Sequence, residues 1–246
     1  MTLPSNSSMD IFPHNTLANY QTKLHKTVEL GGAGEWEVAI VEMMFPLTMY
    51  NVGQHENFIR LVAENEKADS KYSVPSQFYS SNEHLLSSIT CIPAVNEQFK
   101  FAYQQSTGRF SINRTKECKA AINMGKDLVK ILGFEIDAPF AFGVAKHPAN
   151  LLASVPQQLF VYSDIVEPQL VGDTIAPLLR IVAIRSKFEF GKCVAVTYET
   201  PHYIRVQRRQ FETIEIDIRD NTGKPIPFEF GTVIVKLHFR RQIPGC

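Results

Sequence analysis

The sequence has little of what catalysis, metal binding or membrane insertion requires. Its four cysteines lie far apart and form no CxxC pair, so we interpret them as free thiols. No two of its seven histidines have HxH or HExxH spacing, and no GxSxG or phosphate-binding glycine loop occurs. The longest apolar runs, near residues 138–145 and 178–184, are too short to cross a membrane. These absences predict a protein without a metal, a cofactor or a membrane span.

Charge is scarce and balanced. Lysine plus arginine number 25, aspartate plus glutamate also number 25, and charged residues make up only 20% of the 246 positions. Because phosphate contacts need a basic excess, a neutral chain is not expected to bind nucleic acid specifically. Zero net charge also leaves little self-repulsion against association with further copies. The 17 phenylalanines suit a protein whose surface is partly covered by neighbours.

Two segments near the C-terminus alternate between apolar and polar residues. Phe211–Arg219 reads FETIEIDIR and Thr232–Arg241 reads TVIVKLHFRR, and the residues between them include turn-forming Asn, Gly and Pro. A period of two predicts two antiparallel strands, each with one face in a core. The side chains expected to face the interior are Ile214, Ile216, Ile218, Val233, Val235, Leu237 and Phe239.

Most of the remaining chain is also rich in strand patterns. Further strands are predicted over residues 16–24, 35–45, 57–63, 72–79, 158–164, 178–184 and 193–198. Many short strands separated by turn residues indicate an all-β sandwich or barrel. We find no domain boundary and predict a single domain spanning residues 1–246, with a flexible N-terminal arm over about residues 1–12.

A helix–hairpin–helix insertion is predicted over about residues 80–134. Ser80 and Glu83 have capping-box spacing, and apolar residues then recur at helical intervals until Pro93. A hairpin follows over residues 99–113. Gly133 stands where a second helix, Lys126–Leu132, would end in a left-handed cap.

Asp164, Glu167 and Asp173 lie close together in SDIVEPQLVGDT and are the only candidate acid–base group. However, isoleucine follows Asp173 and Thr174, so the Asp-Thr-Gly pattern of aspartic proteases is absent. We therefore interpret the segment as a loop between strands with solvated or turn-capping acids. No catalytic residue is predicted.

Arginines form the one basic cluster, RVQRRQ at residues 205–210, and two more close the last strand. Contact with nucleic acid is one interpretation. A solvated edge, or salt bridges to a neighbouring subunit, is favoured because the chain has no basic excess.

Three blocks of the sequence resemble one family, in the family's order. Trp36–Val52 reads WEVAIVEMMFPLTMYNV and Phe160–Val182 reads FVYSDIVEPQLVGDTIAPLLRIV. The third block, Pro201–Arg241, contains both alternating segments. Together they resemble the minor capsid, or penton, proteins of Polinton (Maverick) elements and the related adintoviruses.

The resemblance implies a jelly-roll β-sandwich that forms homopentamers at the fivefold vertices of an icosahedral capsid. The implied partners are four more copies and a double jelly-roll major capsid protein, and the implied location is the virion, after assembly inside the host cell. It implies no catalysis and no cofactor. A β-sandwich receptor- or glycan-binding attachment module, using loops over residues 138–155 and 164–173, is the alternative.

Subunit contacts are expected on the outward faces of the last two strands and at the arginine cluster. The candidate interface residues are Arg205, Arg208, Arg209, Glu215, Asp217, Lys236, His238 and Arg240.

Overall fold

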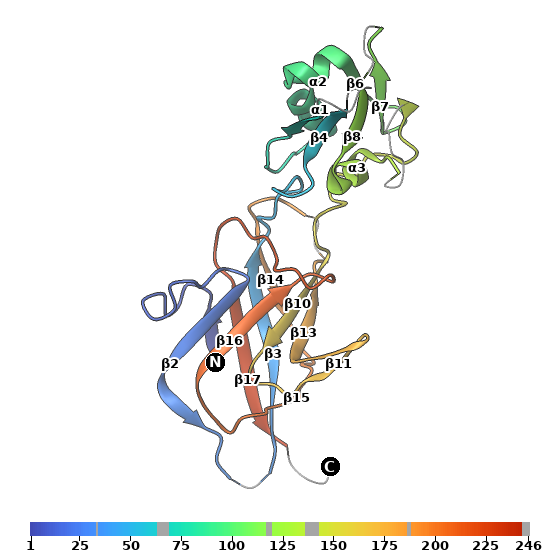
Figure 1. Ribbon diagram of the computed structural model, residues 1–246. Helices are drawn as coiled ribbons and strands as arrows, with labels where there is room; N and C mark the ends of the chain where they lie inside the picture. Colours follow the sequence, from blue (N-terminus) through green and yellow to red (C-terminus); the bar gives the residue numbers. More distant parts are fainter. Residues whose placement is uncertain (33, 63–68, 117–119, 136–142, 186–187, 243–246) are drawn as a thin grey trace. The chain divides into compact units, whose positions relative to one another are not determined.

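The chain folds into two compact units (Figure 1). The computed structural model describes residues 1–32, 34–62, 69–116, 120–135, 143–185 and 188–242. Unit 1 comprises Met1–Met49 and Pro156–Cys246, and unit 2 comprises Tyr50–Val155. This differs from the expected single domain with an insertion over residues 80–134, because the inserted unit begins earlier, ends later and has its own core.

Unit 1 contains two antiparallel sheets. The first has the order β1 (Thr2–Pro4), β17 (Ile234–Arg241), β3 (Trp36–Pro46) and β14 (Cys193–Thr197), and β15 (Ile204–Arg205) also pairs with β3. The second has the order β13 (Leu178–Ala183), β10 (Gln158–Ser163), β16 (Gln210–Arg219) and β2 (Asn19–Glu29). A separate hairpin consists of β11 (Gln169–Val171) and β12 (Thr174–Ala176).

The order of these strands defines a jelly roll. Along the chain, β1, β2, β3 and β10 alternate between the two sheets, β13 follows in the sheet of β10, and β14, β16 and β17 alternate again. Eight principal strands therefore form two facing four-stranded layers, which is the jelly-roll arrangement. The predicted all-β jelly-roll class is confirmed.

The interior between the sheets contains the side chains that the alternation predicted. Ile214, Ile216 and Ile218 of β16 are fully buried. Val233, just before β17, and two residues of β17, Val235 and Leu237, are also buried. Phe239 is half-buried, and its ring stacks on that of Phe211 with 5.9 Å between centroids. The two segments do not pair with each other but belong to opposite sheets.

The N-terminus is part of a sheet, and the expected flexible arm is wrong for its first residues. Thr2–Pro4 pairs with β17, and the Met1 ammonium donates to the Leu237 carbonyl oxygen at 2.7 Å. Leu3 is buried, and its carbonyl oxygen accepts a hydrogen bond from the Tyr20 hydroxyl at 3.1 Å. Burial raises the pKa of the Tyr20 hydroxyl, which keeps this donor protonated. The pairing completes one edge of the first sheet.

Unit 2 packs two small sheets and three helices around its own apolar core. One sheet has the order β5 (Asp69–Ser73), β4 (Phe58–Val62) and β8 (Ala121–Met124). The other has the order β6 (Phe99–Gln104), β7 (Arg109–Arg114) and β9 (Gly143–Val144). The helices are α1 (Asn82–Thr90), α2 (Pro93–Gln98) and α3 (Lys126–Leu132). The helix, hairpin and helix expected from the sequence are present in that order, with α2 and β8 added.

The helix boundaries differ by small amounts from those expected. Ser81, not Ser80, caps α1, and its hydroxyl accepts from the His84 amide at 3.1 Å. Glu83 instead accepts a hydrogen bond from Gln105, which lowers the pKa of its carboxyl. Pro93 follows the end of α1 as expected, but it also begins α2, where its fixed φ and absent N–H fit the first helical turn.

Gly133 ends α3 in the left-handed conformation that the sequence predicts. Its φ is +82°, and the Phe134 amide donates to the Val129 carbonyl oxygen at 3.0 Å. A Cβ atom on Gly133 would lie 2.2 Å from the His147 carbonyl oxygen. Glycine is therefore required here both by the backbone angle and by the close approach of a second segment.

Replacing this glycine should destabilise unit 2. Gly133→Ala is expected to lower its free energy of unfolding by about 2 kcal/mol or more, because strain and overlap add. Gly143→Ala is the matched control: its φ is +80° but no atom lies within 4 Å of the new Cβ, so a loss of about 1 kcal/mol is expected. Hydrogen exchange of α3 amides measures both changes, since the one tryptophan, Trp36, lies in unit 1. Equal losses would contradict the role of the close approach.

Candidate functional site

The described residues contain no recognisable catalytic centre. No group of three or more His, Cys, Asp or Glu side chains among them is arranged to hold a metal ion. In the same described part of the chain, Cys91 and Cys193 are free thiols. No described helix combines the length and the apolar character that crossing a bilayer demands.

Of the acids considered as an acid–base group, Asp164 has structural contacts and Asp173 is exposed. Asp164 Oδ1 accepts from the Glu215 amide at 2.8 Å, and its Oδ2 lies 3.8 Å from Arg208 Nη1. Asp173 lies in the exposed turn of the β11–β12 hairpin. The interpretation of the whole segment as a loop is therefore wrong for residues 169–176, which pair as a hairpin around Gly172 and Asp173.

The candidate interface residues of β17 already have partners on the outer face of the first sheet. Lys236 forms an ion pair with Glu42, and Arg240 pairs with Glu37 at 2.9 Å. The guanidinium of Arg240 also lies 3.6 Å from the centroid of the Tyr203 ring. These cross-strand pairs satisfy the outward charges within one chain.

The third candidate residue of β17, His238, lies on the same outer face. Its Nδ1 lies 2.9 Å from the hydroxyl of Tyr203. Tyr203 therefore contacts both residues, since the Arg240 guanidinium lies over its ring. His238 is itself exposed. The outer face of β17 therefore combines an exposed imidazole with ion pairs that the chain completes by itself.

Residues of β16 lie on the outer face of the other sheet. Glu215 accepts from Asn19 Nδ2 at 3.2 Å and from Gln21 Nε2 at 3.4 Å. Asp217 forms an ion pair with Arg219 at 2.6 Å. Because β16 and β17 belong to opposite sheets, their outward residues face away from each other and do not form one patch.

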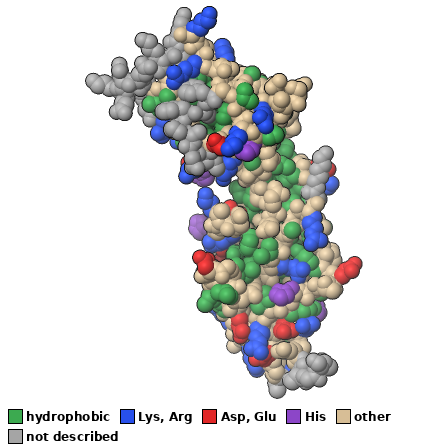
Figure 2. Space-filling view, turned by 90° about the vertical axis from the view of Figure 1, so that its right-hand side faces the viewer, with side chains coloured by type: hydrophobic (Ala, Val, Ile, Leu, Met, Phe, Trp, Pro, Cys, Tyr) green, Lys and Arg blue, Asp and Glu red, His purple; other side chains and the backbone are tan. Residues whose placement is uncertain are grey.

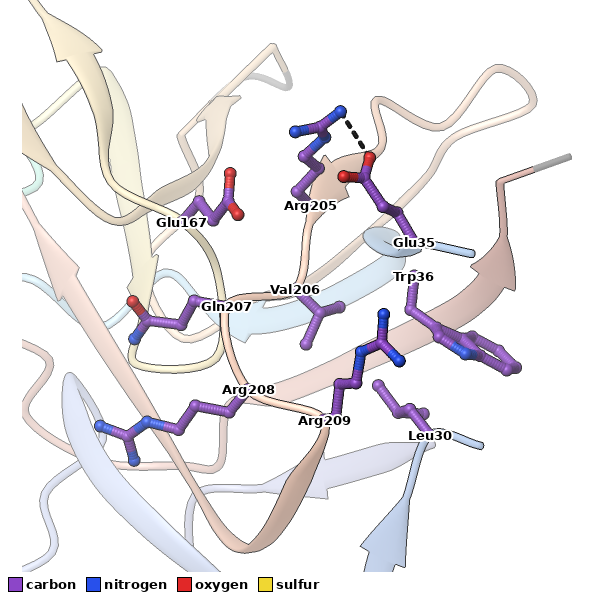
Figure 3. A pocket seen from close by; sticks show the side chains of 9 residues that line it. All are labelled: Leu30, Glu35, Trp36, Glu167, Arg205, Val206, Gln207, Arg208 and Arg209. Atoms are coloured by element: carbon purple, nitrogen blue, oxygen red, sulfur yellow. Dashed lines mark ion pairs between the residues drawn. The ribbon is translucent and has the colours of Figure 1, made fainter. Parts of the chain in front are cut away.

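The three remaining candidates, Arg205, Arg208 and Arg209, gather around an open pocket (Figure 3). The other side chains that line it are Leu30, Glu35, Trp36, Glu167, Val206 and Gln207. β15 and the loop after it bring the arginines to this place, because the Val206 amide donates to the Trp36 carbonyl oxygen at 2.8 Å. The sequence located the arginines but not the apolar residues beside them.

The arginines of this pocket differ in how well their charge is compensated. Arg205 forms an ion pair with Glu35, and Arg208 lies 3.8 Å from Asp164. Arg209 donates to the Gly34 carbonyl oxygen at 3.1 Å, and no carboxylate among the described residues lies within ion-pair distance of it. The pocket thus presents one cation without an anionic partner near the Trp36 side chain.

A second exposed feature was not found from the sequence. Leu170 and Ile175 of the β11–β12 hairpin are 76% and 73% exposed. The signal was available, since the Gly172-Asp173 pair between short apolar runs is typical of a two-residue hairpin turn.

Comparison with known proteins supports the fold. No protein-family model matches the sequence, and no curated protein matches it. Among solved structures, the mavirus penton protein is similar with a TM-score of 0.52 and 12% identity, over 98% of this chain and 99% of that one. A chain of the Sputnik virophage structure is similar with a TM-score of 0.46 and 10% identity, over 98% and 97%. This chain therefore shares the fold of the mavirus penton protein along nearly its whole length.

The ion pair on the outer face of β17 should contribute to the stability of the isolated chain. The Glu37 side chain is only 13% exposed, so Arg240→Ala leaves a half-buried carboxylate without its partner. We expect unit 1 to lose about 1–2 kcal/mol in denaturant unfolding followed by Trp36 fluorescence. Lys23→Ala is the control, because Lys23 and Glu212 are 35% and 58% exposed and should contribute less than about 0.5 kcal/mol. Equal losses of stability in Arg240→Ala and Lys23→Ala would contradict a larger contribution from the Arg240–Glu37 pair.

Proposed function

We propose that this protein is a structural virion protein: the minor capsid, or penton, protein that forms homopentamers at the fivefold vertices of a Polinton-like virus or transposon capsid. The observation that carries the proposal is the similarity to the mavirus penton protein, which covers both units rather than the sandwich alone. The three sequence blocks that resemble Polinton and adintovirus pentons lie along the same chain and support the narrower assignment.

The surface chemistry is compatible with such a role. A ring requires one patch of a subunit to contact a different patch of the next, and zero net charge does not oppose this association. The proposed partners are four further copies and a double jelly-roll major capsid protein. The proposed location is the capsid vertex, after assembly inside the host cell. Catalysis forms no part of this role.

The oligomeric state tests the proposal. Mass photometry and sedimentation velocity should reveal a species with five times the 27.8-kDa chain mass, increasing with concentration. Negative-stain images of that species should show a fivefold ring. Co-expression with the major capsid protein should place the chain in particles. A chain that stays monomeric at high concentration and is absent from particles would show that the proposal is wrong.

Attachment to a receptor or glycan is a second candidate function. The observation that favours it is unit 2, a compact unit with its own core inserted between β3 and β10 of the jelly roll. Of the loops expected to bind, residues 138–142 lie outside the described residues, and residues 169–176 form a hairpin. Specific, saturable binding of the full chain on a glycan array, competed by free glycan, is the expected result. A uniformly negative array and cell-binding assay would contradict this function.

A further inference from the structure

The β11–β12 hairpin presents an apolar pair to solvent. Leu170 and Ile175 are direct partners in the register, so they lie side by side on one face of the ribbon. They are the two most exposed large apolar side chains among the described residues. Single exposed apolar residues are common, but a paired one at the end of a projecting element is typical of a contact surface.

The hairpin is held in place by its base rather than by its tip. A two-stranded ribbon is only marginally stable alone. Here Gln169 Nε2 donates to the Leu178 carbonyl oxygen at 2.5 Å, and Val166 forms a bridge with Val206. Figure 1 shows the hairpin standing out from the side of unit 1, and Figure 2, which views the molecule from that side, shows apolar side chains gathered in unit 1. The hairpin therefore keeps a defined position although its apolar pair contacts little of its own chain.

The turn of the hairpin adds a negative charge. Gly172 has a φ of +62° and allows the tight two-residue turn that exposes Asp173 next to it. No cationic side chain among the described residues lies within ion-pair distance of Asp173. The exposed end of the hairpin thus combines two apolar side chains with one anion that has no partner.

The arginine pocket has the complementary composition. Leu30, Trp36 and Arg209 lie on the same side of it, whereas Arg208 extends away from them (Figure 3). The Trp36 Nε1 donates to the Gly31 carbonyl oxygen at 3.2 Å, which holds the indole in a fixed orientation. The pocket therefore places the partly exposed Trp36 side chain beside the one arginine of the cluster that lacks an anionic partner.

We propose that the β11–β12 hairpin of one copy docks into the Arg209 pocket of the next copy. Leu170 and Ile175 pack against Trp36, and Asp173 pairs with Arg209. The hairpin in the pocket belongs to a second copy of this chain. The reason is that Asp173 and Arg209 are both present in one sequence and neither has an oppositely charged partner among its described residues. Hairpin and pocket are different patches, so the contact is heterologous, and it gives a ring where the rotation between successive copies closes. This inference rests on the proposed penton function and names the contact through which the ring forms.

Removing the apolar pair tests the docking. The double variant Leu170→Ser/Ile175→Ser should raise the concentration at which rings form by at least tenfold, measured by mass photometry. Val144→Ser is the matched control: Val144 is 63% exposed in unit 2 and its loss should leave assembly unchanged. Thermal unfolding of both variants should match the unaltered chain, since the side chains are exposed. Rings that form equally well without Leu170 and Ile175 would overturn the docking and leave the penton function intact.

Photocrosslinking identifies the neighbour of the hairpin directly. A benzophenone amino acid at position 175 of the full chain should, in assembled rings, form crosslinks to residues 30–36 or 204–209 of another copy. Crosslinks confined to other residues, or to the major capsid protein, would overturn the proposal. A chain that never assembles and forms no crosslink would contradict both the contact and the penton function.

Charge reversal and nucleic-acid binding separate the remaining alternatives. Asp173→Arg and Arg209→Asp should each weaken ring formation, whereas an equal mixture of the two variants should assemble better than either alone, because opposite charges then meet at every contact between unlike copies. If Arg209→Asp leaves rings intact but abolishes binding of a single-stranded oligonucleotide, the pocket belongs to nucleic acid and the docking is overturned.

Discussion

Burial of alternate side chains between the two sheets is the constraint on which unit 1 depends. β16 and β17 are both central strands, one in each sheet, and their inward residues fill the same interior. Because side chains alternate along a strand, every buried isoleucine or valine places its neighbour on an outer face. Charges at those outward positions need partners, and β3 supplies them: Glu37 and Glu42 pair with Arg240 and Lys236. The core thus determines where the charged surface lies.

The same constraint leaves little freedom for function within the sheets. The inward residues of β16 and β17 are buried and their charged outward residues have partners within the chain, so new surfaces arise in the connections. Unit 2 occupies the connection from β3 to β10, the β11–β12 hairpin the one from β10 to β13, and the arginine pocket the one from β14 to β16. A protein that assembles through its connections can keep the jelly roll while its contacts change. This agrees with a shared fold at only 12% identity to the mavirus penton protein.

Predictions from the sequence succeeded where the structure is set by local pattern. The alternation over residues 211–219, the helix ended by Gly133 and the hairpin over residues 99–113 all follow from neighbouring residues. Pairing between distant segments was not visible. Thr2–Pro4 becomes a strand only because the edge of β17 accepts it, and β8 becomes one only beside β4. None of the eight candidate interface residues is buried, and their distribution over two opposite faces and a pocket depends on which sheet each strand joins.

The sequence by itself determined the fold class: its alternating segments predict an all-β sandwich, and its net charge is zero. These properties depend only on composition and on the spacing of neighbouring residues, which do not change when the chain folds. Only the tertiary structure decided that β16 and β17 face each other across the core, that the inserted unit has a core of its own, and that Leu170 and Ile175 remain exposed. The physical reason is that burial is a property of the whole fold. An isoleucine in an alternating segment is interior in β16, as Ile216 is, but exposed in β12, as Ile175 is. The difference is whether a second sheet covers that face of the strand.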